Sequence, residues 1–487
     1  MAAVFNMTAT IVGGGVLSIP LSCARAGILP FTILMVLSAV ATDFSLYLLV
    51  SCARRCGSTS FGAVCRSSFG SALEMAATFI IFCLVGFIVV GLSILNMGIW
   101  APIVITWAAS VRGETAPAQS TALEDALVLA TLLVLMMPFL LKRDLTSLRH
   151  ICYVGFFSIS ILCCAMIYRA TEKMISSPDL VEQIKWSTSS FADILSALPI
   201  ILLAFLSSFN MISVHCSLID PTRRRVKGVI HKAVFLSFLL MYLFGLSGYL
   251  FALEETNGNI LLNFDPTDRV ILLGRIGCGI TTLFALPMNT LPCREALLSW
   301  VAQIGEVSAR RGAKREEQRH LLERRSGEAL DRTNKPFRKS QTMPSEKGDS
   351  GNTIDEESGR NEESIGYGAN LDLEQQQIQA IEASATKPVA PLSEQVVHRL
   401  TTFAIILACY IAAVLAPGVA IVWDIAGSSM AFLIQFILPA LCYIRLKIRA
   451  GASSRSNNLI WAHILLCFGT VTAILCTVQT VWRLACK

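Results

Sequence analysis

Apolar residues in this chain gather in long blocks instead of recurring at the spacing of an amphipathic helix. A helical block of about 20 apolar residues is long enough to cross the hydrocarbon core of a bilayer. The blocks therefore predict about eleven membrane spans. These spans cover residues 4–27, 29–52, 74–99, 124–141, 148–169, 193–217, 229–252, 270–291, 397–416, 420–444 and 459–482.

The composition is typical of a membrane protein. Hydrophobic residues fill 54% of the 487 positions and charged residues only 15%, whereas soluble domains average about 25% charged residues. We therefore expect an all-α polytopic protein embedded in a lipid bilayer. The net charge of +6 is explained by membrane topology, so it does not indicate nucleic-acid binding.

One long connection separates the spans into two groups. Residues 301–395 are rich in Arg, Glu, Ser, Gln and Gly, a composition that cannot bury enough apolar surface to offset the entropy of ordering. We expect a disordered loop between a segment with the first eight spans (1–300) and one with the last three (396–487). Within the loop, Glu317 to Leu322 resembles an acidic dileucine signal. Sorting or signalling proteins are therefore candidate partners, with a plain solvated linker as the alternative.

Basic residues near the span ends predict the orientation in the membrane. If eleven spans are counted, every basic cluster falls on the same side. The clusters include Arg54 and Arg55, Lys142 and Arg143, Arg223 to Arg225, Arg310 and Arg311, and Arg445 and Lys447. The pattern predicts that the N-terminus and the long loop are cytosolic and that the C-terminus is extracytosolic.

The sequence indicates no metal, cofactor or catalytic centre. Its sixteen Cys residues lie mostly inside apolar blocks without a paired CxxC framework, so we interpret them as small buried hydrophobes. Cys52 and Cys56 are one helical turn apart, but no His or further Cys pair accompanies them. The loops carry no catalytic constellation, and we do not expect an enzyme.

Three consecutive glycines, Gly13, Gly14 and Gly15, interrupt the first span, with Pro20 shortly beyond them. Each glycine costs a helix about 1 kcal/mol relative to alanine, so the run should open the helix inside the bilayer. Freed backbone groups survive there only if they are buried in protein or bind something polar. The alternative is close helix packing through small residues.

The sixth span carries a matching interruption five spans later. Ser207, Ser208, Asn210 and Ser213 form a polar patch at mid-depth, where polar groups usually face a cavity or a partner helix. Broken helices in corresponding positions of two halves indicate a transporter site between two inverted repeats of five spans.

The chemistry of such a site suits an amino acid. Free N–H groups of Gly13 to Gly15 at a half-helix N-terminus would bind a carboxylate. Carbonyl groups of the unwound sixth span would accept hydrogen bonds from the ammonium group, and Phe205 or Phe209 would close over the side chain. Ser208 and Asn210 complete the candidate substrate-binding set.

These residues resemble the amino acid/auxin permease family, which includes sodium-coupled neutral and yeast vacuolar amino acid transporters. The resemblance rests on Ile11 to Pro20, Leu198 to Phe205, Leu218 to Val226, and Arg275 with Pro287 and Pro292. It covers every span and leaves out the long loop. It implies a LeuT-like fold of 5+5 inverted repeats with helices one and six broken, and secondary transport across a vacuolar, lysosomal or plasma membrane.

Two departures from the family bear on coupling and on substrate choice. Sodium-coupled members place asparagine where Ala9 stands and threonine where Leu283 and Ala285 stand. Apolar side chains remove the oxygen ligands that a hard cation needs, so we expect proton-coupled or facilitative transport. The sixth span also has Ser208-Phe209 in place of the His-Pro pair of many relatives, which leaves the amino acid open.

Asp43 is the candidate for proton coupling, because an intramembrane carboxylate is by default a functional residue. The alternative is an interfacial acid paired with Arg54 or Arg55. The sequence as a whole predicts an amino acid transporter, with neutral amino acids as substrates and alternating access as its mechanism. The alternative class is an amino acid sensor that signals through the long cytosolic loop.

Overall fold

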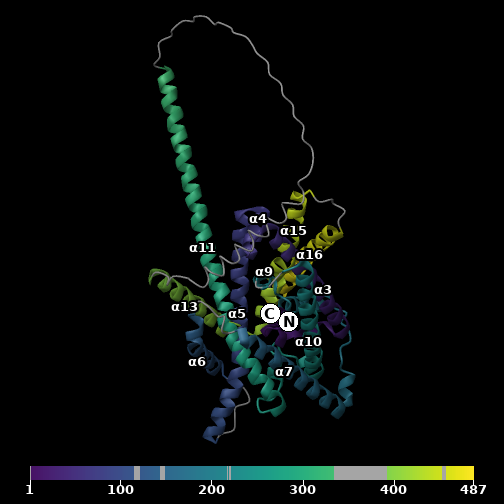
Figure 1. The fold of residues 1–487 in the computed structure, drawn as a ribbon. Coiled ribbons are helices and arrows are strands. Elements are labelled where there is room, and N and C mark those ends of the chain that lie inside the picture. Colours follow the sequence, from purple (N-terminus) through teal and green to yellow (C-terminus); the bar gives the residue numbers. More distant parts are fainter. Residues whose placement is uncertain are drawn as a thin grey trace, which may run out of the picture. The chain divides into compact units, whose positions relative to one another are not determined.

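The computed structural model of this chain is almost entirely helical (Figure 1). It describes residues 2–113, 121–142, 149–216, 218, 221–333, 392–451 and 457–486. Within these, the chain divides into two units, Met1–Trp300 with Val396–Lys487, and Val301–Gln395. We describe each unit by itself, and the candidate site lies in the first.

The helices follow the predicted blocks. The first half of the chain forms α1 (Ala2–Ile11), η1 (Gly14–Ser18), α2 (Ile19–Ala26), α3 (Ile28–Cys56), α4 (Phe61–Phe69), α5 (Ser71–Arg112), α6 (Ala122–Leu140), α7 (Arg149–Ser176) and η3 (Pro178–Val181). The second half forms α8 (Phe191–Ala204), α9 (Ser208–Cys216), α10 (Arg223–Ala252), η4 (Leu253–Glu255), η5 (Ile260–Asn263), α11 (Arg269–Thr333), α13 (Leu392–Leu415), α14 (Val419–Ile425), η6 (Ala426–Ala431), η7 (Leu433–Ile437), α15 (Leu438–Arg449) and α16 (Asn457–Ala485).

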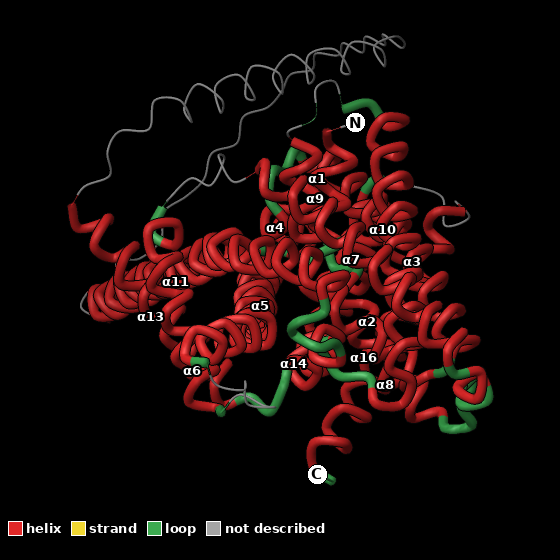
Figure 2. Tube along the Cα trace, turned by 90° about the horizontal axis from the view of Figure 1, so that it is seen from below, coloured by secondary structure: helices red, strands yellow, loops and turns green. Residues whose placement is uncertain are grey.

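Among the described residues, ten helices are long and apolar enough to cross a membrane. The bent pair formed by α1 with η1 and α2 makes eleven if it counts as one span. The predicted spans are therefore confirmed by length and composition. Figure 2 shows the same bundle from below, after a quarter turn.

A glycine joins the first two spans at a close backbone approach. Gly27 lies between α2 and α3 with φ of 82°, a left-handed conformation that favours glycine. A Cβ there would lie 2.9 Å from Cα of Ser187. The next amides, of Ile28 and Leu29, donate to the carbonyls of Lys185 and Trp186 at 3.1 and 2.9 Å. The segment before α8 is thereby pinned to the turn that ends α2.

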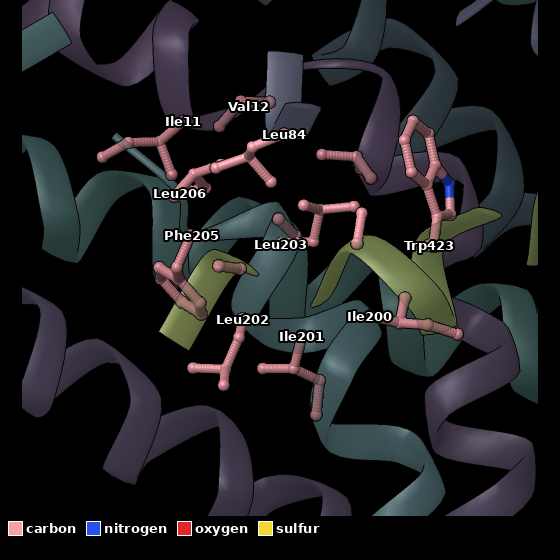
Figure 3. Close-up of a cluster of buried hydrophobic side chains, with 14 of the residues drawn as sticks. Ile11, Val12, Leu84, Ile200, Ile201, Leu202, Leu203, Phe205, Leu206 and Trp423 are labelled. Carbon is pink, nitrogen blue, oxygen red and sulfur yellow. The ribbon is translucent and has the colours of Figure 1, made fainter. Parts of the chain in front are cut away.

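The apolar core surrounds the two interruptions in the helices. Ile11 and Val12 come from the end of α1, and Phe205 and Leu206 follow α8, all of them nearly inaccessible to solvent. Figure 3 shows these side chains in one cluster with Leu84 of α5 and Trp423 of α14. Tight packing on all sides holds both interruptions in place.

The long connection differs in part from the expected disorder. Helix α11 continues beyond the membrane-spanning part as far as Thr333, whereas residues 334–391 lie outside the described part of the chain. Residues 302–333 are rich in Arg, Glu, Gln, Ala and Leu, which are strong helix formers. Residues that lack an apolar face for a core can therefore still continue a helix. The dileucine-like Glu317 to Leu322 lies on this helix.

Candidate substrate site

The glycine run breaks the first span as predicted. Helix α1 ends at Ile11, Gly13 is extended with φ −95° and ψ −160°, and η1 begins at Gly14. The two parts of the span meet at an angle of 41°. Gly14 and Gly15 open a new helical turn, and the first amides of a turn have no acceptor within it. Their N–H groups are the ones expected to face a ligand.

The three glycines differ in how much space surrounds them. A Cβ on Gly14 would lie 2.7 Å from Cδ2 of Leu92, whereas one on Gly15 would lie 3.5 Å from Cα of Ala204. A Cβ on Gly13 would meet only the Thr10 carbonyl oxygen, at 3.8 Å. Gly14 therefore serves close packing against α5, and Gly15 brings the first break next to the end of α8. Gly13 alone has open room.

The sixth span breaks where its polar patch begins. Helix α8 ends at Ala204 and α9 starts at Ser208, so Phe205, Leu206 and Ser207 form the break. The Ser207 hydroxyl donates to the Phe205 carbonyl at 3.3 Å. A predicted pair of broken helices, five spans apart, is thus present, and the Gly15–Ala204 approach places the two breaks side by side.

A glutamine from the tenth span occupies the second break. The Oε1 atom of Gln435 accepts hydrogen bonds from the Ser207 and Ser208 amides, each at 3.2 Å, and from the Ser208 hydroxyl at 2.6 Å. Its Nε2 donates to the Phe205 carbonyl at 3.5 Å. The Gln435 carbonyl in turn accepts from the Ser45 hydroxyl of α3. The first amides of α9 are therefore satisfied by a side chain.

Sequence reasoning missed Gln435. The signal was available: it is a lone carboxamide in the apolar run Phe432–Ile437, at a depth where polar groups usually have a partner helix. It lies in a π-helical segment, η7, and such segments often occur at functional sites.

The other predicted site residues take different places. Phe205 and Ser208 are fully buried at the break, while Asn210 is half-buried in the first turn of α9. Asp43 lies elsewhere, in a groove between α3 and α10. There its Oδ1 atom is 2.5 Å from Nδ1 of His231. The interfacial pairing considered for Asp43 involved Arg54 or Arg55, and the structure gives it His231 instead.

A partly buried ion pair lies toward the end of α2. Arg25 contacts both carboxylate oxygens of Asp424 on α14, at 2.8 and 3.1 Å, and donates to the Ser196 carbonyl of α8 at 2.9 Å. Arg483 of α16 reaches the same carboxylate at 3.5 Å. These groups line a small cavity of about 80 Å³. The contacts tie four spans together on this side of the site.

Trp423 and Ser18 form a further hydrogen-bonded contact between α14 and η1. The Trp423 indole N–H donates to the Ser18 hydroxyl at 3.0 Å, and this hydroxyl donates to the Gly258 carbonyl at 2.5 Å. A Cβ on Gly91 would lie 2.1 Å from the Trp423 ring. The ring therefore fits only because position 91 has no side chain.

Ala9, Leu283 and Ala285 are apolar residues at the positions where sodium-coupled relatives have oxygen-bearing side chains. The neighbouring hydroxyls are also engaged within the protein. Thr8 donates to the Val4 carbonyl at 2.9 Å, and Thr282 donates to the Asn96 side chain at 3.2 Å. No cluster of three or more His, Cys, Asp or Glu side chains suited to a metal occurs among the described residues.

Two broken helices, five spans apart and packed at their breaks, define a LeuT-like membrane transporter fold. Comparison with solved structures agrees: the crystal structure of MhsT in complex with L-phenylalanine aligns over 98% of both chains with a TM-score of 0.54 at 12% identity. At that identity the likeness concerns the fold alone.

The chain belongs to the transmembrane amino acid transporter protein family, whose pattern matches residues 1–482. It is 26% identical over 305 residues to vacuolar amino acid transporter 7 of Saccharomyces cerevisiae, covering 61% of this chain and 58% of that protein. It is 24% identical over 310 residues to putative sodium-coupled neutral amino acid transporter 11 of Danio rerio, covering 63% and 67%. The matched regions thus span roughly three fifths to two thirds of these relatives. The predicted family is confirmed.

Proposed function

We propose that this chain is a secondary transporter of neutral amino acids that works by alternating access. The observation that carries the proposal is the pair of helix breaks at Gly13 to Gly15 and Phe205 to Ser207, in contact through Gly15 and Ala204. Unpaired backbone polar groups inside a bilayer need a polar partner. A zwitterion supplies both a negative and a positive partner without any charged side chain at the breaks.

In this proposal the substrate lies between the two breaks. Its carboxylate binds the amides of Gly14 and Gly15, helped by the positive end of the η1–α2 half-helix. The Gly13 amide donates to the Ile11 carbonyl at 2.9 Å, so Gly13 contributes the open space through which the carboxylate approaches. The ammonium group of the substrate donates to the Phe205 carbonyl, in place of the long hydrogen bonds that this carbonyl accepts from Gln435 at 3.5 Å and from Ser207 at 3.3 Å. The Phe205 ring, Ser208 and Asn210 surround the side chain and select for a neutral one.

We propose transport without sodium. The apolar side chains of Ala9, Leu283 and Ala285 support this, because sodium prefers oxygen ligands. A proton gradient is the alternative driving force, with Asp43 as the group that carries the proton. The groups that face Asp43 are His231, at 2.5 Å, and the charge of Lys227, with Lys232 lining the same groove. Facilitated transport is the remaining form of the proposal.

The basic clusters support an orientation with the N-terminus and the connection between α11 and α13 in the cytosol. The name of the yeast relative, vacuolar amino acid transporter 7, supports a vacuolar or lysosomal membrane over the plasma membrane. Immunofluorescence with a tag on either end, with and without permeabilisation, tests both points. Loss of the tag signal on the expected side would overturn the orientation.

The test is uptake of labelled neutral amino acids into proteoliposomes that contain the purified full chain. We expect uptake that is saturable, independent of sodium and, in the proton-coupled form, accelerated by an inward proton gradient. Strict dependence on sodium would overturn the coupling proposal. Binding without any net flux would overturn transport and favour the sensor class instead.

Gly13→Ala tests the site without disturbing its packing. The added methyl group meets only the Thr10 carbonyl oxygen, at 3.8 Å, so we expect a folded protein with a stiffened break and a shielded carboxylate site. The matched control is Gly86→Ala on α5, where a Cβ has nothing within 4 Å. We expect at least a tenfold rise in KM for Gly13→Ala and none for the control. Equal kinetics in both variants would remove the glycine run from the binding site.

A further inference from the structure

A groove on the membrane-facing side of α3 and α10 belongs to no part of the proposed substrate site. It has a volume of about 590 Å³. Its walls are almost entirely apolar. The ionisable residues that line it are Asp43, His231 and Lys232, which lie together at one end. The lining residues are Val36, Ala39, Val40 and Asp43 of α3 and His231, Lys232, Val234, Phe235 and Phe238 of α10.

The groove is open to the bilayer rather than to the interior of the protein. Val40 and Phe235 on its rim are 64% and 65% exposed. In a membrane protein, such exposed apolar side chains contact lipid chains. From His231 to Phe238 the groove follows α10 for about 10 Å at 1.5 Å per residue. Its shape suits one extended hydrocarbon chain.

The ionisable end of the groove lies nearest the strongly basic end of these two helices. Lys232 is nine residues, or about 14 Å, from the start of α10 at Arg223, close enough for its long stem to reach toward the interface. Exposed Arg54 and Arg55 end α3, and exposed Arg223, Arg224 and Lys227 begin α10. Arg54 and Arg223 are close enough to repel each other.

The ionisable end of the groove therefore carries a net positive charge, because few acidic side chains lie near its basic residues. Asp43, the one carboxylate that lines the groove, is already bound to His231. Basic residues grouped beside membrane helices attract anionic lipid headgroups, at about 1 kcal/mol for each Lys or Arg near the surface. A zwitterionic headgroup has no net charge to offer them.

We infer that the α3–α10 groove binds an anionic phospholipid. One acyl chain lies along Val36, Val40 and Phe235, and the phosphate pairs with Lys227 and Lys232. Binding would tie α3 to α10 at a surface that also contains the Asp43–His231 pair. The groove shares Asp43 with the proton-coupled form of the proposed transport, but lipid binding is measured without transport, so either proposal can fail without the other.

Native mass spectrometry of the purified full chain, with equimolar phosphatidylserine and phosphatidylcholine, tests the headgroup. We expect preferential retention of phosphatidylserine, weakened about fivefold for each lysine in Lys227→Gln/Lys232→Gln, since about 1 kcal/mol corresponds to that factor. The control, Lys142→Gln, removes a lysine from the connection after α6 and should retain the lipid. Equal retention of both lipids, or equal loss in the control, would overturn the inference.

A second measurement locates the acyl chain, and its first part uses the wild-type chain alone. Phosphatidylserine with a photoreactive group on its acyl chain should crosslink the wild-type chain within residues 36–43 and 231–238. Filling the groove with Ala39→Phe should abolish this crosslink, whereas Ala412→Phe on the exposed face of α13 should not. Crosslinks spread evenly over other membrane helices would refute a specific groove.

Discussion

Replacing Gln435 by leucine removes the side chain that satisfies the break in the sixth span. Leucine is similar in size and apolar, so the change mainly deletes the carboxamide. The Ser208 hydroxyl can rotate to another acceptor, but the amides of Ser207 and Ser208 belong to the fixed backbone of two buried residues. A buried donor left without an acceptor costs about 1–3 kcal/mol.

Two such amides raise the free energy of the closed break by roughly 2–5 kcal/mol, because the costs of neighbouring groups do not add fully. If this cost acts locally, the break should open more often by a factor of about 30 or more. Hydrogen exchange measured by mass spectrometry on peptides that cover residues 203–212 checks this directly. We expect the protection of the Ser207 and Ser208 amides to fall by that factor, with a lower midpoint of thermal unfolding.

Two further variants control the reasoning. Asn289→Leu also deletes a carboxamide, but Asn289 bonds within its own helix, to the Ala285 carbonyl at 2.9 Å, so the break should stay protected. Gln435→Glu keeps an oxygen that accepts from both amides and should preserve protection at residues 207–208. If Gln435→Leu left their exchange unchanged, the glutamine would not hold the break, and the account of the second interruption would be wrong.

Three other perturbations address separate features. Hydrogen bonds from Arg169 and the Val270 amide outweigh partial burial and hold the pKa of Asp268 below its usual value. The contribution of Asp268 to stability is therefore present above about pH 4 and is lost as the pH falls through the lowered pKa. Asp268→Asn should lower the midpoint of thermal unfolding at pH 7, and this effect should become smaller below about pH 4. Asp43→Asn should flatten the pH dependence of uptake by at least half in proteoliposomes, while an unaltered profile would leave Asp43 with a structural role. Gly91→Ala should reduce both stability and transport, because its Cβ would overlap the Trp423 ring, and thermal unfolding with uptake measures both.

Block length and residue type were sufficient to predict the spans and both breaks. An apolar block of about 20 residues has few alternatives to crossing a bilayer, and three glycines in a row cannot continue a stable helix there. The partners of polar side chains were harder to predict. Gln435 reaches a break 227 residues away, and His231 reaches Asp43 across 188 residues. Such contacts depend on packing that one-dimensional patterns do not record.

The connection after Trp300 shows the limit of composition as a guide. The lack of apolar periodicity predicts disorder for residues 301–395, yet residues 302–333 continue α11 as helix to Thr333. Helix propensity is a local property, whereas burial requires a partner surface.

The glycine run has two interpretations from sequence, close packing and a binding break. Gly14 serves packing and Gly13 has open space, so both interpretations of the run apply, to different residues.

The tenth span holds the two halves of the sixth span by different kinds of contact. On the α8 side, a Cβ on Gly427 of η6 would lie 2.2 Å from the Pro199 carbonyl oxygen, so the two backbones touch with no side chain between them. On the α9 side, Gln435 of η7 is joined through hydrogen bonds. Hydrogen bonds can be exchanged for bonds to water or to a ligand at small net cost, whereas separating packed backbones opens a void. If the chain works by the proposed alternating access, the motion should therefore keep α8 with the tenth span and release α9 at Gln435.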